Sequence, residues 1–309
     1  MGPKPSAPNF DSSVPEIPGN LNTLETWINS SEKHVEFLKP DNQARIIWAD
    51  SANKTQTEWA IVYLHGYSAT WAEGEPVHKN LAKYIQANLF LSRLVGHGIE
   101  NGENMLEITA ENLYLSAKEA LFIGEKLGKK VIVVGTSTGG TLALKLAADF
   151  PDKIAGLILY SPNIEIHDKT AYLLNKPWGL KIAETVFGGN KRGYEADSLT
   201  QNYWTTKNQR LESLVQLQEF LEATMTNETF EKIKIPVFVG YYYRNENECD
   251  QVVSVPAMHK MFKQLASEKK IKLNFPETQN HVLGSYIKSK NYQKLELCSK
   301  WFLREKVLN

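Results

Sequence analysis

The sequence predicts an α/β fold, with a mostly parallel central sheet flanked by helices and a small inserted cap. Three observations support this prediction. A strand, a sharp turn and a helix follow one another around Ser137. A serine, an acid and a histidine follow three predicted strands in that order along the chain, and a long aromatic-rich interval precedes the strand that leads to the acid. The fold class and a candidate site are therefore predicted together.

The turn Gly-Thr-Ser-Thr-Gly at residues 135–139 joins the apolar run 131–134 to the helix-like segment 142–148. A serine at such a turn has a strained backbone, and glycines are required where a side chain would strike the neighbouring strand or helix. The turn lifts the hydroxyl of Ser137 clear of the sheet. It also aims the N–H of Thr138, at a helix N-terminus, toward the group attacked. Ser137 is the predicted nucleophile and Thr138 a predicted oxyanion donor.

The predicted strand 235–241 runs into a polar loop that contains the candidate acid, Asp250. Glu246 and Glu248 are rival acids in the same loop. The context Asp-x-Val-Val favours Asp250, because it places this residue at the start of the next helix.

The predicted strand 271–275 is followed by a loop that ends at His281, the candidate base. The order serine, acid, histidine is the one that the α/β-hydrolase fold uses. His65 and His97 lie in glycine-flanked turns after two other strands. We expect these two histidines to bind loop backbone and to have a structural role.

The predicted strand 58–64 ends at His-Gly-Tyr, and the N–H of Tyr67 is the second candidate oxyanion donor. Four motifs then resemble the bacterial carboxylesterase and monoacylglycerol lipase branch of the α/β-hydrolases: HGYSAT (65–70), RLVGHG (93–98), MLEIT (105–109) and GTSTGGTL (135–142). The resemblance extends from about Trp59 to the C-terminus. It implies a serine esterase with a small cap, acting on short- to medium-chain acyl esters or on monoglycerides. Thr138 departs from the Met or Leu usual in the family, and the loop before Asp250 is longer and more polar.

Composition excludes several classes of function. The 309 residues carry no net charge, which argues against a nucleic-acid partner. Cys249 and Cys298 are the two cysteines, and no Cys/His cluster indicates a metal, so no cofactor or metal is expected. No stretch is long and apolar enough to be a transmembrane segment. The expected partner is a small acyl ester, and the sequence predicts no oligomeric state.

Residues 1–30 are expected to form an extended or disordered leader, because five prolines lie within the first 18 residues. The hydrolase domain is expected to occupy residues 31–309. The chain as it stands has no signal-peptide pattern, which indicates a cytoplasmic protein unless an export signal was removed upstream of the leader.

The interval at about residues 163–209 is the predicted cap, since an insertion after the strand 154–160 would cover the carboxyl ends of the sheet. Residues 211–225 have helical spacing and are expected to return to the core. Six aromatics in the interval are expected to form an apolar roof over an acyl pocket: Tyr172, Trp178, Phe187, Tyr194, Tyr203 and Trp204.

These placements predict a carboxylic-ester hydrolase that forms an acyl-serine intermediate. A serine peptidase or amidase and a thioesterase are alternatives on the same three residues. An aminopeptidase would need acidic side chains for the substrate ammonium, for which Glu73, Glu75 and Glu165 are candidates. A non-catalytic binding protein that retains the fold is the alternative from a different class.

Overall fold

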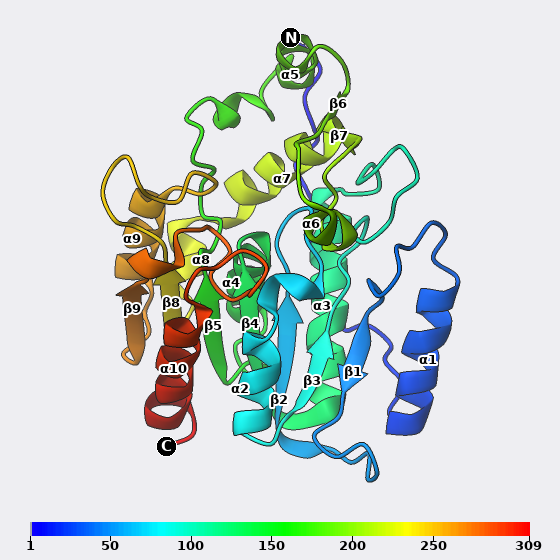
Figure 1. Ribbon diagram of the computed structural model, residues 1–309, viewed down its shortest axis with the longest axis vertical. Helices are drawn as coiled ribbons and strands as arrows, with labels where there is room; N and C mark the ends of the chain where they lie inside the picture. Colours follow the sequence, from blue (N-terminus) through cyan, green and yellow to red (C-terminus); the bar gives the residue numbers. More distant parts are fainter. Residues whose placement is uncertain (1) are drawn as a thin grey trace.

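In the computed structural model, which describes residues 2–309, a seven-stranded sheet crosses the middle of the molecule (Figure 1). The strand order is β1-β3-β2-β4-β5-β8-β9, and all neighbours are parallel except the antiparallel edge pair β1 and β3. The strands are β1 (Arg45–Ile47), β2 (Thr57–Leu64), β3 (Asn88–Leu91), β4 (Gly128–Thr136), β5 (Gly156–Tyr160), β8 (Val237–Tyr241) and β9 (Lys270–Asn274). The predicted α/β class is confirmed.

Strand β4 is the centre of the sheet and explains why the sequence reads as continuous apolar runs. The four apolar residues 131–134 are at most 2% exposed, because helices cover both faces of the sheet. A parallel strand buried on both faces has no polar face and therefore no alternating pattern. Ile132 pairs with Ile61 on β2 and with Gly156 on β5, which fixes the register of the three strands.

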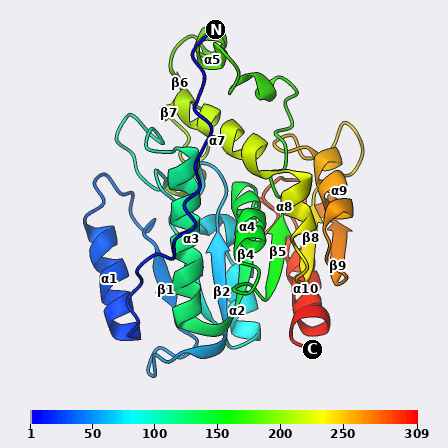
Figure 2. The ribbon, with the colours of Figure 1, turned by 180° about the vertical axis from the view of Figure 1, so that it is seen from behind.

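Helices form one layer on each face of the sheet. Each of α1, α3, α4, α7, α8 and α9 contributes buried side chains to one apolar cluster, and α2 and α10 contribute to the cluster on the other face. Figure 2 shows the first layer in front, and Figure 1 shows the second. The helices are α1 (Leu21–Lys33), α2 (Val77–Tyr84), α3 (Ala110–Leu127), α4 (Thr138–Asp149), α7 (Leu211–Thr224), α8 (Asn227–Glu231), α9 (Val255–Gln264) and α10 (Tyr292–Phe302). In the described part of the chain, no helix is long and apolar enough to cross a membrane.

The segment between β5 and α7 lies beyond the carboxyl ends of the parallel strands (Figure 1). Its elements are η2 (Ala171–Leu173), α5 (Gly179–Phe187), β6 (Lys191–Arg192), α6 (Ser198–Tyr203) and β7 (Gln209–Arg210). Four of the six aromatics expected to form a roof have exposed fractions of 46–57%: Tyr172, Trp178, Phe187 and Tyr194. Trp204 alone among the six is fully buried, at 5% exposure.

The expectation of an extended leader over residues 1–30 is wrong for its second part, which forms α1. Asn20 caps this helix by accepting hydrogen bonds from the N–H groups of residues 22 and 23, and Leu24 and Ile28 are buried against the core. Residues 2–18 are extended and cross α3 toward α5 (Figure 2). Met1, the first residue of the predicted leader, lies outside the described residues.

Specific contacts hold this N-terminal segment on the surface. The ring of Phe10 packs edge-on against Tyr114 and Phe220, with ring centroids 5.1 and 5.5 Å apart. The buried ammonium of Lys118 donates to the carbonyl oxygens of Asp11 and Ser13 at 2.7 and 2.8 Å. The segment is therefore part of the packed structure. It reaches the inserted segment through Pro3, whose carbonyl accepts the Trp178 N–H at 2.9 Å.

Candidate active site

Ser137 lies at the sharp turn between β4 and α4, in a backbone conformation that residues other than glycine rarely adopt. Its φ is 53° and its ψ is −120°. Four backbone hydrogen bonds fix this geometry: Ser137 N donates to Tyr160 O at 2.9 Å, and Ser137 O accepts from the N–H groups of Gly140, Asn163 and Thr141 at 2.9, 3.0 and 3.2 Å. A strained residue persists only where its surroundings determine it, and such residues cluster at functional sites.

Close backbone approach explains the two glycines that flank the serine. A Cβ on Gly139 would lie 1.9 Å from Leu64 O, and one on Gly135 would lie 2.5 Å from Gly139 O. Any side chain at either position would therefore collide with backbone. The Gly-x-Ser-x-Gly spacing follows from the way that α4 packs against the ends of β2 and β4.

Asp250 and His281 are brought together from the loops that follow β8 and β9. His281 Nδ1 lies 2.6 Å from Asp250 Oδ2, and Asp250 Oδ1 accepts from Val252 N at 2.9 Å and Val253 N at 3.1 Å. Asp250 is 1% exposed. It lies in the loop before α9, which begins at Val255, so the expectation that it starts the helix is wrong.

The charges of this pair stabilise each other. Burial acts to raise the pKa of Asp250, but His281 and the two backbone N–H groups hold that pKa below its usual value. Burial likewise acts to lower the pKa of His281, and the Asp250 carboxylate holds it above its usual value. Because Nδ1–H donates to Asp250, Nε2 is the nitrogen free to accept a proton.

The two predicted oxyanion donors lie at the first residue of α4 and in the turn after β2. Within residues 2–309, neither the Thr138 N–H nor the Tyr67 N–H donates a hydrogen bond to the protein. Gly66, next to Tyr67, adjoins the nucleophile, since a Cβ on it would lie 2.9 Å from Ser137 Cβ. Ser137 Oγ makes no hydrogen bond in the described part of the chain, so the structure does not join it to His281.

Glu73 is a further acidic group at this site, and its position cannot be read from periodicity. It is 2% exposed, and its Oε2 accepts the Gly66 N–H at 2.5 Å. Burial raises the pKa of Glu73 to about 7. The other two acids considered for a substrate ammonium have partners, because Glu75 pairs with Lys79 and Glu165 with Lys169.

His65 and His97 bind loop backbone, as the sequence predicts. His65 Nε2 accepts the Leu94 N–H at 3.0 Å, so Nδ1 carries the proton and donates to Gly66 O at 3.0 Å. His97 Nδ1 lies 2.8 Å from Val95 O. Burial lowers the pKa of His65 well below its usual value and that of His97 to about 4, so both rings are neutral near pH 7.

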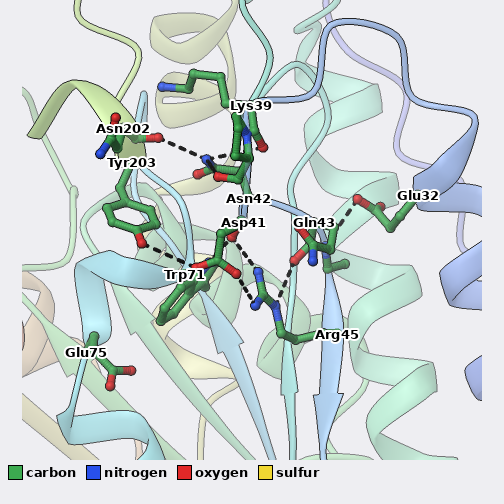
Figure 3. Close-up of polar contacts among 12 residues, drawn as sticks. Glu32, Lys39, Asp41, Asn42, Gln43, Arg45, Trp71, Glu75, Asn202 and Tyr203 are labelled. Atoms are coloured by element: carbon green, nitrogen blue, oxygen red, sulfur yellow. Dashed lines mark hydrogen bonds and ion pairs between the residues drawn. The ribbon is translucent and has the colours of Figure 1, made fainter. Parts of the chain in front are cut away.

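A polar network fixes α6 of the inserted segment to the loop before β1 (Figure 3). Asn42 Nδ2 donates to Asn202 O at 2.9 Å, and Tyr203 Oη donates to Asp41 Oδ2 at 3.2 Å. Lys39 Nζ donates to the carbonyl oxygens of Gln201 and Trp204 at 2.8 and 3.0 Å.

Trp204, held at the end of this network, lies close to the site. It packs in one cluster with Ala69, two residues after Tyr67, and Val282, which follows His281. Trp178 instead lies against Gly2 of the N-terminal segment and lines an outer groove with residues 3–5. Among residues 2–309, no group of three or more His, Cys, Asp or Glu side chains is arranged to hold a metal ion.

A family model described as serine aminopeptidase, S33, matches residues 55–281, which is more than half of the chain. A protein named "Putative esterase/lipase 2" from Mycoplasma pneumoniae is 26% identical over 127 residues. That match covers 41% of this chain and 44% of the relative, so the chain spans less than half of the relative's length.

Solved structures share the fold at low sequence identity. A metagenome-derived lipolytic enzyme, from work on LipS and LipT, has a TM-score of 0.68 at 16% identity, covering 87% of this chain and 99% of its own. The monoacylglycerol lipase of Paleococcus ferrophilus has a TM-score of 0.60 at 15% identity, with 84% and 98% covered. A monoglyceride lipase variant from Saccharomyces cerevisiae has a TM-score of 0.58 at 14% identity, with 88% and 97% covered.

Proposed function

Because the chain belongs to the α/β-hydrolase family described as serine aminopeptidase, S33, and is a hydrolase of the esterase and lipase kind, we propose that it is a serine carboxylic-ester hydrolase. Its substrates are short- to medium-chain acyl esters or monoglycerides. The observation that carries the proposal is the 2.6 Å contact between Asp250 and His281, combined with the strained Ser137 turn at the same edge of the sheet.

In the proposed mechanism, Ser137 Oγ attacks the ester carbonyl carbon while His281 Nε2 takes the hydroxyl proton. Asp250 holds the imidazole in the tautomer with a proton on Nδ1 and stabilises the imidazolium that forms. The Tyr67 and Thr138 N–H groups bind the oxyanion, each lowering the barrier by about 3 kcal/mol.

Breakdown of the oxyanion expels the alcohol, to which His281 gives its proton. Water then attacks the acyl-serine while His281 takes a proton from the water. The second oxyanion collapses to release the carboxylic acid, and His281 returns its proton to Ser137 Oγ. Both half-reactions use the same three side chains, because His281 alternates between base and acid.

We assign the role of a cap to residues 163–209, which would set the preferred acyl length and supply no catalytic group. Support comes from the position of this segment beyond the strand ends and from Trp204, which packs beside residues adjoining Tyr67 and His281. The similarity to monoacylglycerol and monoglyceride lipases agrees with an acyl-glycerol substrate.

Ester substrates fit this site better than peptides with a free amino terminus. Glu75 and Glu165 are paired with lysines, and Glu73 is 2% exposed and accepts the Gly66 N–H, so none of the three candidates is an exposed, unpaired carboxylate for a substrate ammonium.

The test is hydrolysis of p-nitrophenyl esters of increasing acyl length by the wild type and by Ser137→Ala. We expect the variant to lose about 10⁶-fold in kcat with an unchanged fold, because the nucleophile and the histidine act as a unit. Ser267→Ala is the matched control, since it also removes a buried hydroxyl, one without a hydrogen-bond partner. Substantial activity in purified Ser137→Ala would contradict the proposal.

A further inference from the structure

Glu73 is a buried carboxyl group that the proposed Ser137, Asp250 and His281 set does not use. It lies in the short helix η1 (Trp71–Gly74), just after the turn that contains Tyr67. Burying a carboxyl group is costly unless hydrogen bonds compensate. Its backbone partner is the Gly66 N–H, at 2.5 Å from Oε2, and the Tyr63 hydroxyl also faces it, so the carboxyl group is held at a defined place beside the site.

The carboxyl group and the nucleophile lie on either side of one glycine. A Cβ on Gly66 would lie 2.8 Å from Glu73 Oε1 and 2.9 Å from Ser137 Cβ. Gly66 therefore has to be glycine, and Glu73 reaches the backbone immediately before the N–H of Tyr67. A hydrogen bond to a charged acceptor is about twice as strong as a neutral one, so Glu73 can fix the orientation of this turn.

The charge of Glu73 also acts on His281. Burial is the largest influence on the pKa of Glu73 and raises it to about 7, while His281 acts in the opposite direction. In turn, Glu73 raises the pKa of His281, after the larger effect of Asp250. The other titratable groups that face Glu73 are the hydroxyls of Tyr63 and Tyr194, and Arg192 lies beyond, facing Tyr194 and Tyr67.

We propose, resting on the hydrolase function above, that Glu73 is a positioning residue of this site. Its carboxyl group holds the Gly66 N–H so that the next N–H, that of Tyr67, points to the oxyanion, and its negative charge favours the imidazolium form of His281. A buried acid with one backbone partner beside a candidate base is the kind of group expected at a functional site.

Two variants separate the two effects. Glu73→Gln keeps an oxygen that can accept the Gly66 N–H but removes the charge, whereas Glu73→Ala removes both. Glu75→Gln is the matched control, because Glu75 lies two residues away and pairs with Lys79 at 2.8 Å, outside the site. For each protein, kcat and KM for a short ester are measured from pH 5 to pH 9, normalised to the concentration of sites that a fluorophosphonate labels.

We expect the acid limb of the pH profile of Glu73→Gln to move to lower pH by about half a unit or more, since loss of the negative charge lowers the pKa of His281. Its kcat at high pH should stay within about threefold of the wild type. Glu73→Ala should lose about 10- to 100-fold in kcat with little change in KM, because the lost interaction acts on the transition state. Glu75→Gln should match the wild type.

A Glu73→Gln profile that superimposes on that of the wild type, with full kcat in the labelled Glu73→Ala protein, would make Glu73 a purely structural group and overturn the inference. If Glu73→Ala does not fold, the pH profile of the isosteric Glu73→Gln decides alone. A wild type that neither hydrolyses esters nor reacts with fluorophosphonate would contradict the proposed function and the inference with it. An active wild type with an unmoved Glu73→Gln profile would contradict only the inference.

Discussion

The turn around Ser137 and the inserted segment between β5 and α7 are held in place in different ways. The turn is fixed by neighbours at one edge of the sheet: four backbone hydrogen bonds, two glycine contacts and the buried residues 131–136 of β4. The inserted segment is held by residues far away in sequence, among them Pro3 at its α5 end and Lys39, Asp41 and Asn42 at its α6 end.

The two regions therefore differ in how firmly their backbone is held in place. Packed strand ends over-determine the geometry at Ser137, so this turn needs little from the rest of the molecule. The α5 end of the inserted segment instead has exposed apolar side chains, among them Ile182 at 47% and Val186 at 75%, and few buried contacts. Segments of this kind have low local stability and are the usual source of motion near a site.

Among the variants that test this comparison, Asp250→Asn is expected to have the largest effect on activity. We expect a loss of about 10⁴-fold in kcat, because asparagine stabilises the wrong tautomer of His281. Glu248→Gln is the control in the same loop, since Glu248 is exposed and contacts Arg244 at 3.4 Å. Steady-state kinetics with a short ester measure both, and a larger loss in Glu248→Gln would assign the acid to that residue.

The pH profile gives a second prediction. His281 must be neutral to act as a base, and Asp250 holds its pKa above the usual 6.5. The acid limb of kcat/KM in the wild type should therefore lie above pH 6.5, with activity falling as the pH drops and the imidazole is protonated. In the residual activity of Asp250→Asn the limb should move to lower pH, and an unmoved limb would mean that another group controls it.

The inserted segment is tested with its two tryptophans. Trp204→Ala should lower activity on long esters more than on acetate, since each buried methylene contributes about 0.8 kcal/mol at most. It should also lower stability by about 3–5 kcal/mol, because Trp204 is 5% exposed. Trp178 is 55% exposed and lies against the N-terminal segment, so Trp178→Ala should leave the preferred acyl length unchanged. Equal losses on acetate and long esters in Trp204→Ala would assign it a packing role alone.

The smallest effect is expected for Phe10→Ala, which loosens the N-terminal segment. Loss of two edge-on ring contacts should reduce stability by about 1–2 kcal/mol and leave the kcat for a short ester unchanged. Phe37→Ala is the control, since Phe37 is 63% exposed. Thermal unfolding measures both, and a loss of short-ester activity in Phe10→Ala would show that the distant contacts also hold the Ser137 turn.

The predictable parts of the molecule are those with a local physical signature. The strands of the sheet appear as apolar runs, and the turn at Ser137 appears through glycines that close backbone contacts require. The order of Ser137, Asp250 and His281 along the chain allowed a site to be predicted before its geometry was known.

Other features depend on contacts that no local pattern contains. The helix α1 is not evident in the sequence, because it directly follows a proline-rich stretch and has only an Asn20 cap and two buried apolar residues as local signals. The exposure of Trp178 and the burial of Trp204 depend on which distant segment covers each ring. Glu73 lacks any periodic signal, because its partner is a backbone N–H seven residues earlier in the chain.

Mass spectrometry after reaction with a fluorophosphonate tests the central claim most directly. Ser137 should carry the adduct, which tryptic digestion would place on the peptide of residues 131–145, between Lys130 and Lys145. We expect one adduct on this peptide in the wild type and none in Ser137→Ala, with labelling slowed strongly in His281→Ala because the base is lost. An adduct on another peptide, or labelling that persists in Ser137→Ala, would contradict it.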